Sequence, residues 1–140
     1  MIDSLLLVDD NPIDQKLYAR LIQRSGLVSH YESCLSGPAA LERLAEGPVD
    51  LMLLDVNMPG MSGFDMLDMA LAEFGPDVAR VVIVMLTTSI AVADRARAAE
   101  FDIVRGYVAK PLTLAHLKDC DALVQKAREA QPLRGSRTAC

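Results

Sequence analysis

The chain has 140 residues, of which 51% are hydrophobic and 24% are charged, and its formal net charge is −5. This length fits one domain with a sizeable core, and the acidic balance argues against binding of nucleic acid through a basic face. The longest purely apolar run, residues 81–86, is far too short to span a bilayer, and the three widely spaced cysteines fit neither a disulfide framework nor a zinc site. We therefore expect a cytoplasmic protein that binds neither nucleic acid nor membrane.

Short apolar runs alternate along the chain with stretches of helical periodicity. The apolar runs predict strands near residues 4–8, 27–33, 50–54, 80–86 and 103–108. The helices are expected after Asn11, after Ser36, over 64–74 and 91–100, and after Thr113. In the first helix, Ile13, Leu17 and Leu21 recur every four residues and predict its buried face. Residues 129–140 are expected to form a disordered tail, because 131–140 hold Pro, Gly, Ser and Arg without periodicity.

Polar residues that can take part in chemistry follow four of these strands, at the point where each strand ends. They are Asp9 and Asp10, Asp55, Thr87, and Lys110. Alternating strands and helices favour a doubly wound α/β fold with a parallel sheet, in which the ligand crevice lies beyond the carboxyl ends of the strands. We therefore predict that these side chains, although far apart in the sequence, meet in one pocket.

Three carboxylates, a hydroxyl and an ammonium together suit a divalent cation and a phosphoryl group. Two carboxylates about 4 Å apart repel each other by roughly 4 kcal/mol at an effective dielectric of about 20. A bound Mg²⁺ ion relieves this repulsion, because it prefers oxygen ligands. Asp55 stands alone after a buried strand, and a carboxylate can act as the nucleophile that forms an aspartyl phosphate. Mg²⁺ and Lys110 would shield the incoming phosphoryl oxygens.

These residues, in this order, resemble the receiver domain of two-component response regulators over about residues 4–126. The matching motifs are Val8-Asp9-Asp10, Leu54-Asp55 with Met58-Pro59-Gly60-Met61-Ser62-Gly63, Leu86-Thr87-Thr88, and Tyr107-Val108-Ala109-Lys110-Pro111. The resemblance implies a receiver domain over residues 1–128 with a flavodoxin-like fold. That fold is a doubly wound sheet of five parallel strands in the order 2-1-3-4-5.

The resemblance also implies how the pocket holds its metal. Asp55 is the phosphoacceptor and a ligand of Mg²⁺, and Asp10 is a second direct ligand. The backbone carbonyl of Asn57 completes the protein ligands, and Asp9 contributes through a water molecule.

On the phosphoryl side, the resemblance implies that Thr87 and Lys110 bind the phosphoryl oxygens. Thr87 and Tyr107 form the conformational switch, because a movement of Thr87 toward the phosphoryl group vacates space into which Tyr107 can rotate. Asn57 and Ser89 are the rate-tuning positions, where a small polar side chain can orient a hydrolytic water.

We therefore expect a single-domain response regulator, a phosphoprotein of bacterial-type two-component signalling. It would accept a phosphoryl group from a histidine kinase or a histidine phosphotransfer protein and act as a switch or a phosphorelay carrier, without turning over a separate substrate. Its unknown downstream target would be a protein that contacts the fourth helix, the fifth strand and the fifth helix. A homodimer is also compatible with the sequence.

Two other classes of protein share parts of this pattern. A small aspartate-nucleophile phosphatase uses the same metal and carboxylate chemistry, but it needs a second acid two residues after the nucleophile, where this chain has Asn57. A flavodoxin-like FMN binder needs a phosphate-binding loop after the first strand, where Asp9 and Asp10 would repel a phosphate unless a metal were bound.

Overall fold

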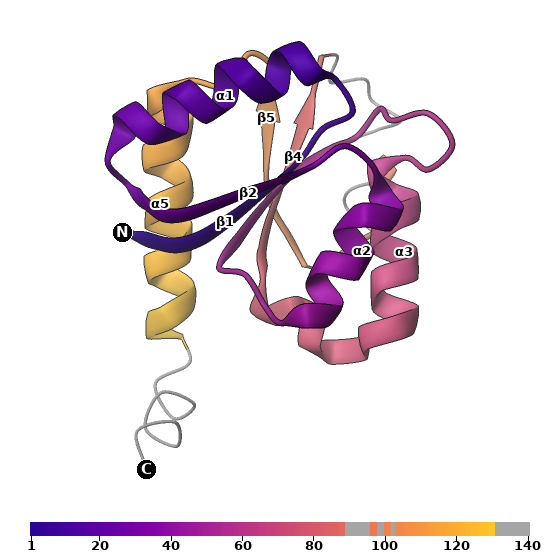
Figure 1. The fold of residues 1–140 in the computed structure, drawn as a ribbon. Helices are drawn as coiled ribbons and strands as arrows, with labels where there is room; N and C mark the ends of the chain where they lie inside the picture. Colours follow the sequence, from indigo (N-terminus) through magenta and orange to yellow (C-terminus); the bar gives the residue numbers. More distant parts are fainter. Residues whose placement is uncertain (89–95, 98–99, 102, 131–140) are drawn as a thin grey trace.

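A computed structural model gives the structure of the protein and describes residues 1–88, 96–97, 100–101 and 103–130. Its centre is a sheet of five parallel strands in the order β2-β1-β3-β4-β5 (Figure 1). The strands are β1 (Ile2–Val8), β2 (Val28–Cys34), β3 (Leu51–Asp55), β4 (Val82–Thr87) and β5 (Val104–Ala109). The fold class and strand order predicted from the sequence are confirmed.

Helices cover both faces of the sheet (Figure 1). On one face lie α1 (Pro12–Ser25) and α5 (Leu114–Glu129), and on the other lie α2 (Gly37–Glu46) and α3 (Gly63–Phe74). Each face of the sheet has its own hydrophobic core. Ile22 and Leu117 belong to the core under α1 and α5, whereas Leu41 and Leu67 belong to the core under α2 and α3.

The central strand β3 explains why the sequence shows continuous apolar runs instead of alternating ones. All five residues of β3 are buried. Leu51 and Leu53 point into the core under α1 and α5, and Met52 and Leu54 point into the core under α2 and α3. A parallel strand with helices on both faces must be apolar at every position, and its first polar residue therefore marks the edge of the sheet.

Side-chain caps fix where the helices begin. The Asn11 side chain accepts hydrogen bonds from the backbone N–H groups of Ile13 and Asp14, with Pro12 at the first helical position. At α5, Thr113 forms a capping box with His116. The predicted helix starts after Asn11, Ser36 and Thr113 are confirmed.

The predicted buried face of the first helix is wrong. Ile13 is 70% exposed and Leu17 is 54% exposed, and Leu21 is only partly buried. The buried residues of α1 are instead Gln15, Tyr18 and Ile22. Tyr18 and Ile22 form a second row with the same helical spacing, and this second row packs into the core beneath α1. Spacing alone cannot choose between two such rows.

Other boundaries shift by a few residues. Arg80, predicted to begin the fourth strand, ends a short 3₁₀ helix, η1 (Gly75–Arg80), and β4 starts two residues later. Glu129, predicted to begin the tail, still lies in α5. The tail prediction for 131–140 and most of the predicted fourth helix lie outside the described residues, although 96–97 are helical. No helix within the described ranges is long and apolar enough to cross a membrane.

Candidate functional site

The first part of the site is the loop that follows β1. Asp9 is completely buried, and its backbone N–H donates a hydrogen bond to the carbonyl oxygen of Cys34 at 3.1 Å. One carboxylate oxygen of Asp9 accepts a hydrogen bond from the N–H of Asn11 at 2.9 Å, and the other faces the Lys110 ammonium, also at 2.9 Å. A carboxylate this deeply buried needs such partners, because an unpaired buried charge is very costly.

Asp55, the last residue of β3, forms the centre of the site and is only 4% exposed. Its Oδ1 accepts a hydrogen bond from the N–H of Asn57 at 3.1 Å, and its Oδ2 lies 3.3 Å from the Nζ of Lys110. Gly63, the first residue of α3, packs against its backbone, since a Cβ atom there would lie 2.5 Å from the Asp55 carbonyl oxygen. Only glycine at this position allows α3 to begin so close to β3.

Asp9, Asp10 and Asp55 meet as the sequence predicted. One carboxylate oxygen from each residue lies within 4.8 Å of the others. Burial raises the pKa of the Asp55 carboxyl from its usual 3.8 to about 6, and although the charge of Lys110 lowers it, the negative charge of Asp9 adds to the rise. A set of carboxylate oxygens with a shortage of positive charge fits Mg²⁺, which binds through hard oxygen ligands. These three residues could therefore hold the predicted metal.

Lys110 follows β5 and reaches into this cluster, with a side chain that is only 9% exposed. Besides Asp9 and Asp55, its ammonium contacts the carboxylate of Asp14 at 3.2 Å. Burial by itself would lower the pKa of Lys110, but the hydrogen bond to Asp9 and the charges of Asp55 and Asp9 outweigh burial and raise the pKa. The ammonium is therefore charged at every physiological pH.

Thr87 and Tyr107 lie on the two strands beside the carboxylates. Thr87 is completely buried at the end of β4, and its carbonyl oxygen accepts a hydrogen bond from the Lys110 N–H at 2.8 Å. Thr87 pairs with Ala109, and Met85 pairs with Tyr107 two residues earlier. Because side chains alternate along a strand, Thr87 and Tyr107 lie on the same face of the sheet.

The two predicted rate-tuning positions have different outcomes. Asn57 is exposed next to Asp55, which its backbone N–H contacts. Ser89 lies outside the described residues.

Two residues of the site were not predicted from the sequence. Asp14 lies in the first turn of α1 and reaches Lys110 from there. Gln15 is buried, and its Nε2 donates hydrogen bonds to the carbonyl oxygens of Asp9 and Cys34, both at 2.9 Å. Their only signal in the sequence is their position directly after the capped start of the helix that follows the acidic loop.

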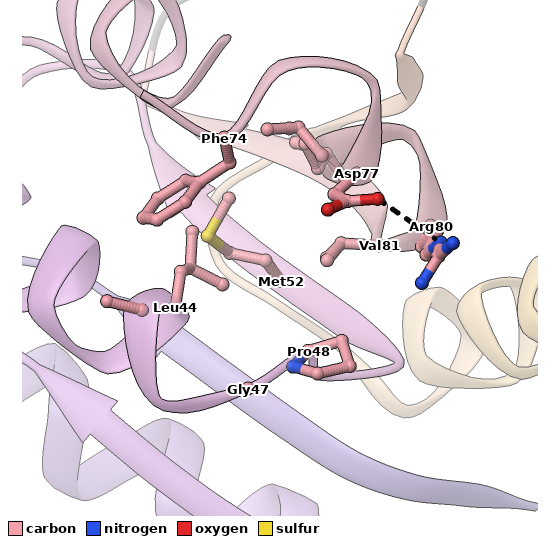
Figure 2. A pocket seen from close by; sticks show the side chains of 11 residues that line it. Leu44, Gly47, Pro48, Met52, Phe74, Asp77, Arg80 and Val81 are labelled. Atoms are coloured by element: carbon pink, nitrogen blue, oxygen red, sulfur yellow. Dashed lines mark ion pairs between the residues drawn. The ribbon is translucent and has the colours of Figure 1, made fainter. Parts of the chain in front are cut away.

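The apolar pocket shown in Figure 2 lies elsewhere in the molecule. It has a volume of about 240 Å³, and its walls include Leu44, Met52 and Phe74, with the 3.6 Å ion pair of Asp77 and Arg80 beside it. Met52 lies near the amino end of β3, whereas Asp55 lies at the carboxyl end of the same strand. The pocket is therefore separate from the carboxylate site.

The fold and the site define a class of protein: a doubly wound α/β domain with an acidic pocket and a lysine at the carboxyl edge of its sheet. The family model of the response regulator receiver domain matches residues 5–120. This chain therefore belongs to the response regulator receiver family, and the resemblance predicted from its motifs is confirmed.

Individual relatives agree with this assignment. The chain is 32% identical to the chemotaxis protein CheY of Pseudomonas aeruginosa over 116 residues, which covers 83% of this chain and 90% of the relative. It is 32% identical to a probable cyclic di-GMP phosphodiesterase of Vibrio cholerae over 82% of this chain, but it spans only 25% of that relative. A two-component response regulator from Cytophaga hutchinsonii has a solved structure with a TM-score of 0.84 and 32% identity, covering 89% of this chain and 98% of that one.

Membership in the family indicates what such a site does in receiver domains generally. Receiver domains are signalling switches that take phosphoryl groups from histidine kinases or phosphotransfer proteins, and they generally bind Mg²⁺ in an acidic pocket. The cluster of Asp9, Asp10 and Asp55 provides such a pocket in this chain.

Proposed function

We propose that this protein accepts a phosphoryl group on Asp55 with the help of Mg²⁺, and that it acts as a phosphorylation-dependent signalling switch or phosphorelay carrier. The observation that carries the proposal is the setting of Asp55. Its carboxylate is nearly buried, lies in a cluster of three carboxylates, and faces the Lys110 ammonium at 3.3 Å. A carboxylate with an ammonium beside it can act as a nucleophile toward a phosphoryl group, because positive charge compensates the arriving oxygens.

Asp10 and Asp55 would hold Mg²⁺ directly, with the backbone carbonyl of Asn57, and Asp9 would act through a water molecule. The bound ion supplies positive charge that stabilises the transferring phosphoryl group. Asp9 is already occupied by the N–H of Asn11 and by Lys110, which supports its indirect role. Asp10, by contrast, is partly exposed at the same edge of the sheet.

Thr87 and Lys110 would bind the phosphoryl oxygens, and Tyr107 would respond as the switch residue. Thr87 and Tyr107 lie on the same face of the sheet, which supports a coupling between these two residues. Asn57 and Ser89 would tune the lifetime of the phosphoryl group. The side chain of Asn57 is an amide, so it cannot provide the second acid that an aspartate-nucleophile phosphatase requires.

The proposed partners follow from the same chemistry. A histidine kinase or a histidine phosphotransfer protein would supply the phosphoryl group in the cytoplasm. The receiver domain would cover residues 1–128, and a target protein, or a second copy of this chain, would contact β5, α5 and the predicted fourth helix.

Reaction with a small phosphoryl donor tests the proposal. Acetyl phosphate with Mg²⁺ should add one phosphoryl group to the wild-type protein, seen as a mass increase that hydroxylamine reverses. Asp55→Asn should abolish the increase, whereas Asp119→Asn, which removes an exposed carboxylate of α5, should retain it. An unchanged mass increase in the Asp55→Asn variant would show that Asp55 is not the phosphoacceptor.

A further inference from the structure

Lys110 has one more carboxylate partner than the proposed reaction requires. Its ammonium lies 2.9 Å from Asp9, 3.2 Å from Asp14 and 3.3 Å from Asp55. A lysine ammonium has three N–H donors, so three carboxylates can occupy all of them. A phosphoryl group arriving at Asp55 therefore has to compete for Lys110 with carboxylates that already hold it.

Asp14 differs from the other two partners in where it lies. It is not part of the cluster of Asp9, Asp10 and Asp55, and its side chain is 26% exposed. Its backbone N–H donates to the side chain of Asn11, the residue that caps α1, so its position in the first turn is set by the start of that helix. It acts on the site through Lys110, the residue its carboxylate contacts.

Asp14 also changes the charge balance of the site. Asp9, Asp10 and Asp55 carry three negative charges, which Lys110 and one Mg²⁺ would neutralise. With Asp14 next to Lys110, the same site keeps one excess negative charge. A negative charge near the entry point of an anion repels it, and the effect is larger in a partly buried site than in water.

Building on the proposed function, we infer that Asp14 is a positioning residue that restrains Lys110 and thereby weakens the site's affinity for the phosphoryl group. The Asp14 carboxylate competes with Asp55 for the Lys110 ammonium, and its negative charge repels an arriving anion. When a neutral side chain replaces the Asp14 carboxylate, the Lys110 ammonium contacts only Asp9 and the group on Asp55.

The variant Asp14→Asn tests this inference, because it removes the charge and keeps the size and hydrogen-bonding oxygen of the side chain. Its matched control is Asp119→Asn, which makes the same change in net charge on an exposed turn of α5. The probe is beryllofluoride with Mg²⁺, a stand-in for the phosphoryl group, titrated by amide NMR. We expect Asp14→Asn to bind beryllofluoride about tenfold more tightly at low salt, the gain shrinking as salt is added. Asp119→Asn should bind as the wild type does.

A second readout follows Lys110 itself in the metal-free protein. The ¹³Cε and ¹⁵Nζ signals of Lys110 should shift in Asp14→Asn and stay unchanged in Asp119→Asn. Asp14→Ala guards against a folding defect. If charge is the cause, this variant should also bind beryllofluoride more tightly than the wild type. If Asp14 serves only to hold the start of α1, Asp14→Ala should not show the tighter binding. Unchanged or weaker beryllofluoride binding in Asp14→Asn, or an unchanged Lys110 signal, would overturn the inference. A wild-type protein that binds no beryllofluoride would instead overturn the proposed function.

Discussion

Asp55 carries its negative charge into a nearly closed site, and this burial has a cost in the metal-free protein. Its pKa rises from 3.8 to about 6, chiefly because of burial. In the folded state, Asp55 therefore binds a proton more tightly than in the unfolded state. Its contribution to the free energy of unfolding should fall as pH rises from 3.8 to about 6. Asp55→Asn should remove the fall and stabilise the metal-free protein by about 3 kcal/mol at neutral pH, since the pKa rises from 3.8 to about 6 and one pKa unit corresponds to about 1.4 kcal/mol.

Urea unfolding at a series of pH values, with a chelator present, measures this effect. Above a pH of about 6 the Asp55→Asn variant should be the more stable protein, and near 3.8 the two should converge. Asp119→Asn should follow the wild-type curve. If the free energies of unfolding of Asp55→Asn and the wild type differed by the same amount at all pH values, burial would not raise the pKa of Asp55.

Single residues also show how far sequence reasoning reaches. Asp9, Asp10, Asp55 and Lys110 each follow an apolar strand, and strand ends of one parallel sheet meet at a common edge. Asp14 lies inside a helix, where an acidic residue is ordinarily solvated. Its contact with Lys110 arises because the folded molecule brings the first turn of α1 beside the residue that follows β5.

Helix α1 shows the same limit for a whole element. Its start was predictable from Asn11 and Pro12, because a cap and a first-turn proline are local signals. Its buried face was not, because two apolar rows share one spacing and burial of Gln15 rests on hydrogen bonds to Asp9 and Cys34. A choice between such rows needs the packing partners.

Two truncations in α1 test which row holds the helix. Ile22→Ala should cost about 2–4 kcal/mol of unfolding free energy, because Ile22 is 2% exposed and leaves a cavity in the core. Leu17→Ala should change stability by less than about 0.5 kcal/mol, since Leu17 is 54% exposed. Chemical denaturation of both variants measures these changes. A larger loss of unfolding free energy for Leu17→Ala than for Ile22→Ala would show that the face predicted from the sequence is the buried one.

Across the whole molecule, the proposed switch should connect the pocket to a distant surface. A phosphoryl group on Asp55 adds negative charge and acceptor oxygens, which should draw Thr87 inward and let Tyr107 rotate on the neighbouring strand. A ligand shifts the equilibrium between two conformations of a surface only if it makes different contacts in the two conformations. With beryllofluoride and Mg²⁺, amide NMR shifts should therefore spread from the pocket to β5 and α5.

Two neighbouring threonines provide the matched test of that coupling. Thr87 is buried and Thr88 is exposed. Thr87→Ala should shrink the distant shifts while shifts near Asp55 still report binding, and Thr88→Ala should leave both intact. Shifts in the wild type that stayed within the pocket loops would identify a passive phosphate carrier.

The phosphorylated residue itself can be located by chemical trapping. After reaction with acetyl phosphate and Mg²⁺, borohydride reduces an aspartyl phosphate to homoserine, and digestion with tandem mass spectrometry shows which residue was converted. We expect homoserine at position 55 and at no other aspartate. Homoserine at position 9, 10 or 14, or a phosphorylated protein without homoserine, would contradict it.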